Sequence, residues 1–435
     1  MPRQKPREIA VRILRKGANR PIPAVSLLAE GLPQLSGLDR GLCQELVLGV
    51  IRRLATLDWL VEQKTDGRQQ QLLTQTLLRL GLYQIFYLDR VPDHAAVNEI
   101  VNIARHHDLD KQSGFINAVL RNCLREKAAW AKRLEELCKY QPAVGYSHPQ
   151  WLVQRWQDRW ADYHALLEWN NLPAPIYARR NTLRTSSAEL EAQWKSEGVA
   201  FEPADFPWLS ARAMYRIEVA GSPAGLTSFD EGKFYVQDPS TLASVQGLDP
   251  QAGENILDLC AAPGGKATAI AQLMQDRGNV LATDIDDTRL DRLRENINRL
   301  GTTCIQPKPL HSIDLNTAGP FDRILVDAPC SNTGVMRRRV DVRWRLQARE
   351  LPVLTRKQLG LLKRAASLLK PGGLLVYSTC SLEVEENEAV IEAFLKKHRD
   401  FRQETTRMIT PMKDGVDGAF AARLRREAPG VNASG

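Results

Sequence analysis

Two cysteines in similar settings are the side chains of this sequence best suited to covalent chemistry. Cys330 lies in the string Asp-Ala-Pro-Cys-Ser at 327–331, and Cys380 lies in Ser-Thr-Cys-Ser at 378–381. A thiolate is a strong nucleophile, but most buried free cysteines are inert packing residues. The combination is more specific than either cysteine, because each follows a short apolar run and Asp327 accompanies one of them.

The elements that must position these cysteines are predicted to form a doubly wound, mostly parallel α/β sheet of the Rossmann-like type. Beyond residue 234, β-rich runs alternate with helical stretches, and we predict one helix over 356–370 that stops at the Pro-Gly-Gly of 371–373. Because ligands bind outside the carboxyl ends of such strands, both cysteines and Asp327 are expected to converge there. The runs lie at 256–259, 280–283, 324–326 and 374–377.

A candidate cofactor loop follows the first of these runs. Its small residues let a ligand approach the backbone, and the helix after them offers unpaired N–H groups. A Walker loop is excluded because Cys260 and Ala267 replace its glycine and its Ser or Thr, and no G-x-G-x-x-G fingerprint is present. Asp284, after the next run, suits ribose hydroxyls, so a ligand with ribose and no phosphates, such as S-adenosylmethionine, is predicted. Its predicted contacts are Cys260, Ala261, Ala262, Pro263, Gly264, Gly265, Lys266, Asp284 and Asp327.

The two cysteines and the carboxylate suit one reaction in particular. Carbon 5 of cytosine is a poor nucleophile, and addition of a thiolate to carbon 6 activates it. A base must then remove the carbon-5 proton so that the thiol can leave, which makes a second polar group useful. A carboxyl near ring N3 would stabilise the charge that develops on addition, and Asp327 is the candidate. Cys260 is interpreted as loop packing rather than as a reactant.

The chain before this region is predicted to form two further parts. Apolar residues recur at helical spacing over 1–140, which indicates an all-helical domain. Two prolines and a glycine at 141–149 indicate a linker, and 141–233 is predicted to hold this linker and a small α+β extension. Residues 234–435 then form the catalytic α/β domain.

Four groups of residues carry a family resemblance. They are Leu-Asp-Leu-Cys-Ala-Ala-Pro-Gly-Gly-Lys at 257–266, Asp-Ala-Pro-Cys-Ser at 327–331, Thr-Gly-Val at 333–335, and Tyr-Ser-Thr-Cys-Ser at 377–381 followed by Glu-Glu-Asn at 385–387. These strings closely resemble the RNA 5-methylcytosine methyltransferases, and the layout is similar to the bacterial ribosomal-RNA small-subunit methyltransferase B (Sun/Fmu) family. The resemblance implies that Cys380 attacks and that Cys330 assists product release. DNA cytosine methyltransferases use the Pro-Cys cysteine instead, so the roles can be tested.

The resemblance extends to RNA-binding parts of the family. Residues 95–101 and 114–121 look like the antitermination factor NusB fold, which binds RNA in its relatives. The segment at 177–182 resembles the family's small RNA-contacting extension, and a basic run at 336–339, with Arg343 and Arg345 after it, follows the Pro-Cys loop. Phosphate contact is favoured over a merely solvated surface there. The predicted RNA contacts are Arg179, Arg180, Arg337 and Arg338.

The sequence departs from the family pattern at one cofactor contact. The family often has an acidic residue on the adenine side after the strand that follows Asp284, and the ungapped alignment puts Leu310 there, with Asp314 as the alternative. The seven cysteines are dispersed without C-x-x-C spacing, and His106 and His107 lack partners at ligand spacing, so no metal is expected.

Composition agrees with an RNA partner without requiring one. The chain has 59 Lys+Arg against 51 Asp+Glu, a formal net charge of +8, which favours a polyanion. No apolar run approaches a membrane span and no signal-peptide core follows the N-terminus, so no membrane contact is expected. Together with the dispersed cysteines this favours a reducing cytoplasm, and the protein is expected to be a monomer. The NusB-like part favours 16S rRNA as substrate. Methylation of tRNA and a non-catalytic RNA-binding or assembly role remain alternatives, and a Cys380 sealed in the interior would exclude the reaction.

Overall fold

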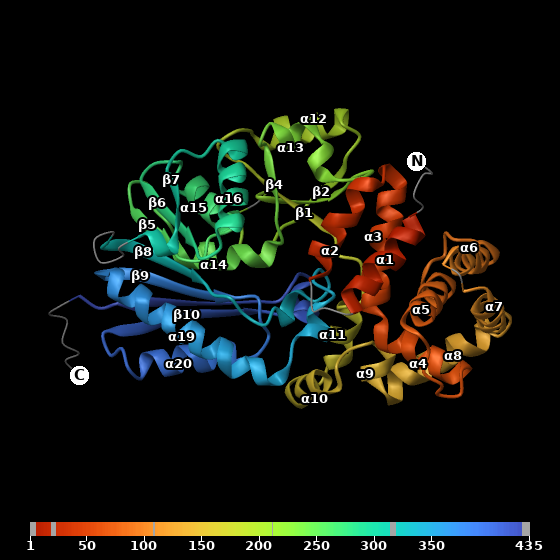
Figure 1. Cartoon of the computed structure of the whole chain (residues 1–435). Helices are drawn as coiled ribbons and strands as arrows, with labels where there is room; N and C mark the ends of the chain where they lie inside the picture. Colours follow the sequence, from red (N-terminus) through yellow and green to blue (C-terminus); the bar gives the residue numbers. More distant parts are fainter. Residues whose placement is uncertain (1–5, 19–22, 108, 211, 314–318, 429–435) are drawn as a thin grey trace. The chain divides into compact units, whose positions relative to one another are not determined.

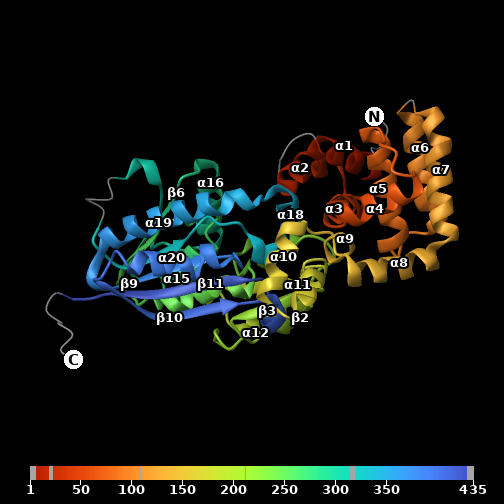
Figure 2. The same ribbon diagram turned by 90° about the horizontal axis from the view of Figure 1, so that it is seen from below.

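The computed structural model describes residues 6–18, 23–107, 109–210, 212–313 and 319–428 (Figures 1 and 2). Its backbone contacts divide the chain into two compact units. The helical unit is Met1–Pro173 with Met336–Ala348, and the α/β unit is Ala174–Val335 with Arg349–Gly435. None of the helices in the described ranges has the length and apolar composition that a membrane span requires.

The helical unit confirms the all-helical prediction for the N-terminal part. Its core is centred on the fifth helix, where Leu77, Leu80 and Leu82 are fully buried, because apolar side chains recur around this helix and its neighbours cover it. Its elements are α1 (Pro6–Ala18), α2 (Ala24–Gly31), η1 (Leu32–Gln34), α3 (Gly37–Arg52), α4 (Leu54–Lys64), α5 (Leu72–Tyr87), α6 (Asp93–His106), α7 (Asp110–Arg125), α8 (Lys127–Tyr140), α9 (Pro142–Gly145), α10 (Gln150–Arg159), α11 (Tyr163–Trp169) and α18 (Val342–Arg345).

The stretch at 141–149 is packed into this unit rather than forming the predicted linker. Pro142 begins α9, a position that proline favours because a first-turn N–H has no helical partner. Ser147 and His148 are buried, and a Cβ on Gly145 would lie 2.5 Å from the Cys138 Cα. The glycine therefore permits close backbone packing, and the linker interpretation is wrong.

A small antiparallel sheet with two helices opens the α/β unit. The order of its strands is β2-β3-β1-β4. Trp194 is fully buried among the rings of Phe201, Tyr215 and Phe234, which forms a separate small core. Its elements are β1 (Ile176–Arg180), α12 (Ser187–Ser196), β2 (Ala200–Pro203), β3 (Met214–Glu218), η2 (Pro223–Gly225), α13 (Thr227–Asp230) and β4 (Phe234–Val236).

The second sheet of this unit confirms the mostly parallel α/β prediction. Its order is β10-β11-β9-β8-β5-β6-β7, with parallel pairing from β9 to β7 and an antiparallel β10–β11 edge. Its elements are η3 (Pro239–Leu242), α14 (Ala243–Leu248), β5 (Asn255–Asp258), α15 (Gly265–Leu273), β6 (Asn279–Asp284), α16 (Asp287–Leu300), β7 (Ile305–Pro309), η4 (Leu310–Ser312), β8 (Phe321–Asp327), η5 (Thr333–Val335), η6 (Ala348–Glu350), α19 (Leu351–Leu368), β9 (Leu369–Thr379), η7 (Val384–Glu386), α20 (Glu388–Leu395), β10 (Phe401–Ile409), α21 (Pro411–Asp414) and β11 (Ala419–Arg426).

Helices cover both faces of this sheet, as the continuous apolar runs of its strands require. Ile256 belongs to the core with α14, α15 and α16, and its neighbour Leu257 belongs to the core with α19 and α20. The two helix groups lie on opposite sides of the strands in Figure 1. The carboxyl ends of β5, β6, β8 and β9 are thereby held in a rigid row.

Two local expectations differ from the structure. The helix predicted over 356–370 is α19, which begins earlier because Pro352 suits a first helical turn, and it ends at Leu368. The Pro-Gly-Gly at 371–373 lies inside β9, at an irregularity of its pairing with β8. The sequence also gave no signal for β7, which contains two prolines; an edge strand tolerates them because one side of it has no ladder partner.

Candidate functional site

The loop after β5 is fastened to the end of β6. The Ala261 amide donates to the Thr283 carbonyl at 2.7 Å, and the Ala262 amide donates to Asp284 Oδ2 at 3.2 Å. Gly264 has φ +106° at the start of α15, a conformation that favours glycine. The backbone of the predicted cofactor loop is therefore fixed against the strand that carries Asp284.

Three carboxylates gather at these strand ends. Asp258 is fully buried, and no hydrogen bond of good geometry reaches its carboxylate oxygens among the described residues, although the nearby Cys260 amide lowers its pKa slightly. Burial and then the charge of Asp327 raise the pKa of Asp258 to about 7, with a smaller contribution from Asp284. Lys266 opposes this shift. The cluster has a surplus of acidic groups, which suits a cationic ligand.

Lys266 links the predicted cofactor loop to the predicted catalytic carboxylate. Its Nζ donates to Asp327 Oδ2 at 2.8 Å, and Ser378 Oγ donates to Asp327 Oδ1 at 2.8 Å. Burial lowers the pKa of Lys266, but the charge and hydrogen bond of Asp327, followed by Cys380, raise it above its usual value. Lys266 is therefore a cation beside both Asp327 and Cys380.

The two predicted reactive cysteines are in direct contact. Cys330 Sγ and Cys380 Sγ are 3.4 Å apart, and the Cys380 thiol donates to Asn332 Oδ1 at 3.3 Å. The hydrogen bond with Cys380 and burial, followed by the charges of Cys380 and Glu386, hold the pKa of Cys330 well above its usual range. Both side chains are half-buried rather than sealed. The condition that would exclude the reaction is therefore not met.

Cys260 differs from this pair. Burial, and then the neighbouring acidic groups, beginning with Asp258, raise the pKa of its thiol far above the usual value. A thiol in such surroundings is a weak nucleophile at neutral pH. The structure thus favours packing over chemistry for Cys260.

Three residues of the site carried no individual prediction. Asn332 accepts from Cys380, Ser378 orients Asp327, and Glu386 accepts from the serines that follow both cysteines. Ser378 and Glu386 lie within the strings that carry the resemblance, and Asn332 lies between two of them. The family strings could have pointed to these residues, but their roles depend on hydrogen-bond partners that lie far away in the sequence.

Arg179 does not present its guanidinium to RNA as predicted. It is 4% exposed, and it donates to Gln237 Oε1 at 2.5 Å, to the Gly265 carbonyl at 2.6 Å and to Thr268 Oγ1 at 2.9 Å. These bonds support the first turn of α15. Arg180 donates to the Thr185 carbonyl at 3.0 Å and is only half-buried, so part of its side chain is exposed.

The basic run after the Pro-Cys loop also differs from the expectation. Arg337 is 4% exposed, with its guanidinium 3.8 Å from the centre of the Trp169 ring. Arg343 is fully buried in the helical unit and donates to backbone carbonyls of three residues and to Asn171 Oδ1. The guanidinium groups of Arg337 and Arg343 therefore contact protein groups and have a structural role. Arg338 is half-buried and Arg339 is exposed.

Of the two residues considered for the adenine side of the cofactor, the structure describes only Leu310. Leu310 is half-buried at the start of η4, directly after β7, and packs against the core that contains β8. Asp314 lies outside the described residues. The described residue at the aligned position is therefore apolar and has no carboxylate to offer.

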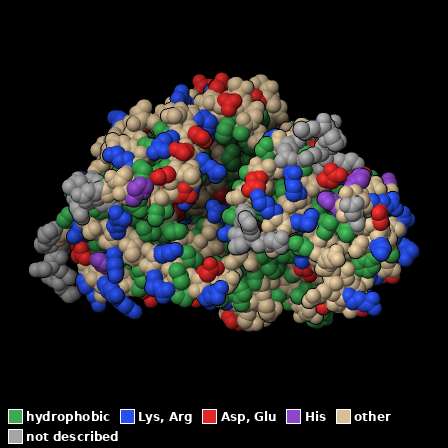
Figure 3. All heavy atoms as spheres, viewed as in Figure 1, with side chains coloured by type: hydrophobic (Ala, Val, Ile, Leu, Met, Phe, Trp, Pro, Cys, Tyr) green, Lys and Arg blue, Asp and Glu red, His purple; other side chains and the backbone are tan. Residues whose placement is uncertain are grey.

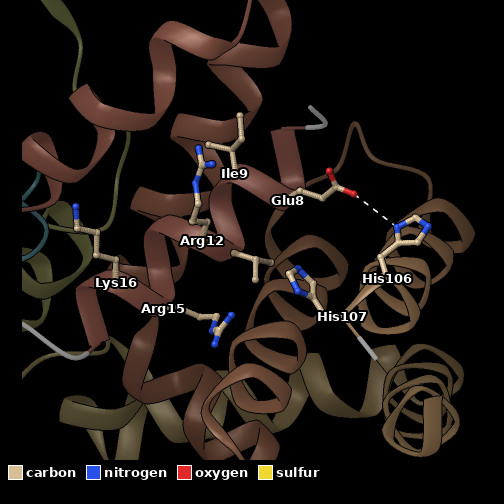
Figure 4. Close-up of a pocket in the computed structure, with 8 residues that line it drawn as sticks. Glu8, Ile9, Arg12, Arg15, Lys16, His106 and His107 are labelled. Atoms are coloured by element: carbon tan, nitrogen blue, oxygen red, sulfur yellow. Dashed lines mark ion pairs between the residues drawn. The ribbon is translucent and has the colours of Figure 1, made fainter. Parts of the chain in front are cut away.

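The helical unit carries a cavity of about 610 Å³ between α1 and α6 (Figure 4). Three cationic side chains of α1 line it, and His106 forms an ion-pair contact of 3.7 Å with Glu8. On the molecular face in Figure 3, by contrast, basic side chains are interspersed with acidic ones. The lining residues are Glu8, Ile9, Val11, Arg12, Arg15, Lys16, His106 and His107.

Comparison with known proteins accounts for all three parts of the chain. A family model described as 16S rRNA methyltransferase RsmB/F matches residues 245–430. The NusB family matches 4–125, and a ferredoxin-like domain of RsmF/B-like methyltransferases matches 148–207. The crystal structure of PH0851 has the same fold, with a TM-score of 0.78, 24% identity and coverage of 97% of this chain and 99% of that one.

Relatives with curated names are similar over nearly the whole chain. The ribosomal RNA small subunit methyltransferase B of Proteus mirabilis is 34% identical over 435 residues, covering 97% of this chain and 98% of the relative. The probable enzyme of the same name from Synechocystis is 38% identical over 431 residues, covering 90% and 92%. A methyltransferase homologue from Pyrococcus horikoshii, with a TM-score of 0.57, is 30% identical and covers 67% of this chain and 98% of its own. The chain therefore belongs to the RsmB/F family of 16S rRNA methyltransferases.

Proposed function

We propose that this enzyme transfers a methyl group from S-adenosylmethionine to carbon 5 of a cytosine in 16S rRNA through a covalent adduct of Cys380. The observation that carries the proposal is the 3.4 Å contact between the Cys330 and Cys380 sulfurs. It lies where two strand ends also bring Asp327 and Lys266 together. Paired thiols beside a carboxylate suit addition to a pyrimidine ring and its reversal.

The acidic cluster supports the cofactor assignment. S-adenosylmethionine carries a sulfonium and an ammonium group, and Asp258 offers buried carboxylate oxygens that no hydrogen bond of good geometry reaches among the described residues. Asp284 is suited to bind the ribose hydroxyls. The loop from Cys260 to Lys266 is suited to contact the rest of the cofactor. When bound, the cofactor supplies an electrophilic methyl group.

Cys380 is the proposed nucleophile because a cationic side chain, Lys266, lies near its sulfur. Lys266 is a cation that interacts favourably with charge on Cys380. The thiolate forms a bond to carbon 6, and the electron pair of the C5–C6 double bond moves towards carbon 5 and ring N3. Asp327, oriented by Ser378 and bonded to Lys266, is proposed to lie at N3, where the proton of its hydrogen bond with Lys266 can pass through it and neutralise that charge.

Cys330 is proposed to serve the second half of the reaction. After carbon 5 gains the methyl group, loss of its proton returns electrons to the ring, the C6–S bond breaks, and the Cys380 thiolate leaves. A group beside the departing sulfur must manage this proton transfer. Cys330 lies in contact with Cys380, and its thiol, which retains its proton at neutral pH, can give that proton to the departing sulfur and accept the carbon-5 proton in its place.

The cavity of the helical unit supports an RNA partner. Arg12, Arg15 and Lys16 of α1 line this cavity together with His106 and His107 (Figure 4). Clustered cations bind phosphates by releasing counterions. These residues are better candidates for phosphate contact than Arg179 and Arg337, whose guanidinium groups are buried.

The test separates the roles of the two cysteines. With 16S rRNA and S-adenosylmethionine, Cys380→Ala is expected to abolish both methylation and adduct formation. Cys330→Ala is expected to leave RNA covalently attached, visible as a shifted band on a denaturing gel. An adduct from the Cys380 variant and none from the Cys330 variant would reverse the roles. Parallel reactions with tRNA, and sequencing for 5-methylcytosine, test the substrate.

A further inference from the structure

Glu386 is a buried carboxylate that the proposed reaction does not use. It lies at the end of η7, is fully buried, and accepts hydrogen bonds from Ser331 and Ser381. The Ser331 amide is 2.9 Å from Oε1, Ser381 Oγ is 2.5 Å from Oε2, and the Ser331 hydroxyl also donates to Oε2. Because each serine directly follows a reactive cysteine, one carboxylate joins the two cysteine loops.

No Lys or Arg among the described residues forms an ion pair with Glu386; its partners are neutral. Gln358 supplies a further donor, with Nε2 at 2.9 Å from Oε1. A buried carboxylate is costly unless donors satisfy it, and removing the carboxylate would leave the same donors unpaired. This arrangement thus fixes the geometry of the loops around it.

The two loops depend on Glu386 to different degrees. The Cys330 loop reaches it through both the amide and the hydroxyl of Ser331, and through Gln358, which also donates to the Pro329 carbonyl at 3.0 Å. The Cys380 loop has other supports, including the Asn387 amide, which donates to the Ser381 carbonyl at 2.9 Å. Loss of the carboxylate should therefore displace Cys330 more than Cys380.

The charge of Glu386 also distinguishes the two thiols. Its negative charge disfavours a thiolate on Cys330 and contributes to the raised pKa of that thiol. Lys266 lies beside Cys380 and has the opposite effect there. Negative charge is therefore disfavoured on Cys330 by Glu386 and favoured on Cys380 by Lys266.

We infer that Glu386 is a positioning residue that holds Cys330 against Cys380. It acts through Ser331 and does not contact the substrate. This inference rests on the proposed function for its catalytic meaning, but the contact between the thiols can be tested without RNA.

The first experiment measures proximity of the sulfurs by cross-linking. Diamide takes two hydrogens from the pair and leaves a Cys330–Cys380 disulfide, which mass spectrometry of the linked peptides quantifies. Glu386→Ala should slow this reaction about 10- to 100-fold, as expected when a reacting group is misplaced by about an ångström. The matched control is Glu392→Ala, which removes an exposed carboxylate of α20. Equal rates in the two variants would overturn the inference.

The second experiment separates attack from release. With RNA and cofactor, Glu386→Ala should accumulate adduct, as a partial copy of Cys330→Ala. Loss of the adduct would show that Glu386 supports attack by Cys380 instead and would overturn the inference. If the wild type itself gives neither adduct nor product, the proposed function fails, while the cross-linking comparison still tests the positioning.

Two conservative variants complete the design. Glu386→Gln preserves shape and can still accept from the Ser331 amide, so cross-linking should be nearly unchanged. The loss of charge should lower the apparent pKa for alkylation of Cys330, and an unchanged pH profile would show that the charge of Glu386 does not act on this thiol. If Glu386→Ala does not fold, Ser331→Ala removes one bond of the bridge and should slow cross-linking by a smaller factor; no slowing would contradict the positioning role.

Discussion

The buried carboxylate of Asp258 permits a prediction with a definite sign. Its pKa is about 7 in the folded protein against an ordinary value of 3.8, so the native state holds a proton that the unfolded chain has lost between these two values. The contribution of Asp258 to the free energy of unfolding must therefore fall as pH rises from about 4 to about 7 and stay constant above that. The difference corresponds to about 4 kcal/mol at pH 8, as an upper bound.

Asp258→Asn removes this ionisation, so it should raise the melting temperature at pH 8 by several degrees and leave it almost unchanged at pH 4. Differential scanning calorimetry across this range is the assay, with Asp291→Asn, an exposed carboxylate of α16, as the control. The same change should weaken S-adenosylmethionine binding in titration calorimetry, because a cationic ligand favours the ionised Asp258. A variant that is less stable at pH 8 and binds the cofactor normally would refute the reasoning.

Three further changes test other parts of the structure. Gly334→Ala places a Cβ 2.8 Å from the Cys380 carbonyl oxygen, so alkylation of Cys380 by iodoacetamide should change its rate while the helical content by circular dichroism stays constant. Arg343→Ala leaves buried carbonyls without their donor and should cost about 3 kcal/mol or more in urea unfolding, whereas Arg345→Ala, at an exposed side chain, should cost little. Arg15→Glu should weaken binding of 16S rRNA fragments and reduce the salt dependence of binding, measured by fluorescence anisotropy, with cofactor affinity unchanged.

The positions of the reactive groups could be predicted because their signals are local. Apolar runs of strand length, followed by small or polar residues, identified the ends of β5, β6, β8 and β9. In a parallel sheet those ends share one edge, so Cys330 and Cys380 had to converge once the sheet was correct. The 3.4 Å contact follows from topology together with the identity of two residues.

The failures share the opposite cause. Arg343 looked like a phosphate contact because charge runs are normally exposed, but its partners include the Arg52 carbonyl, almost three hundred residues earlier in the chain. The proline-rich stretch at 141–149 looked like a linker for a similar reason, since nothing local indicates that His148 is buried. The local composition of a segment therefore predicts exposure only where no distant part of the chain supplies hydrogen-bond acceptors or packs against it.

The electrostatic difference between the two cysteines also depends on residues that are distant in the sequence. In the sequence they are nearly equivalent: each follows a strand and each precedes a serine. In the structure Lys266 lies beside Cys380, and Glu386 lies beyond Ser331 and acts on Cys330. Removing these two charges, while keeping both thiols, would be expected to reduce the difference in reactivity between the two cysteines. A double variant, Lys266→Met with Glu386→Gln, should therefore lower the reactivity of Cys380 towards iodoacetamide and raise that of Cys330, and unchanged relative labelling would show that geometry alone separates them.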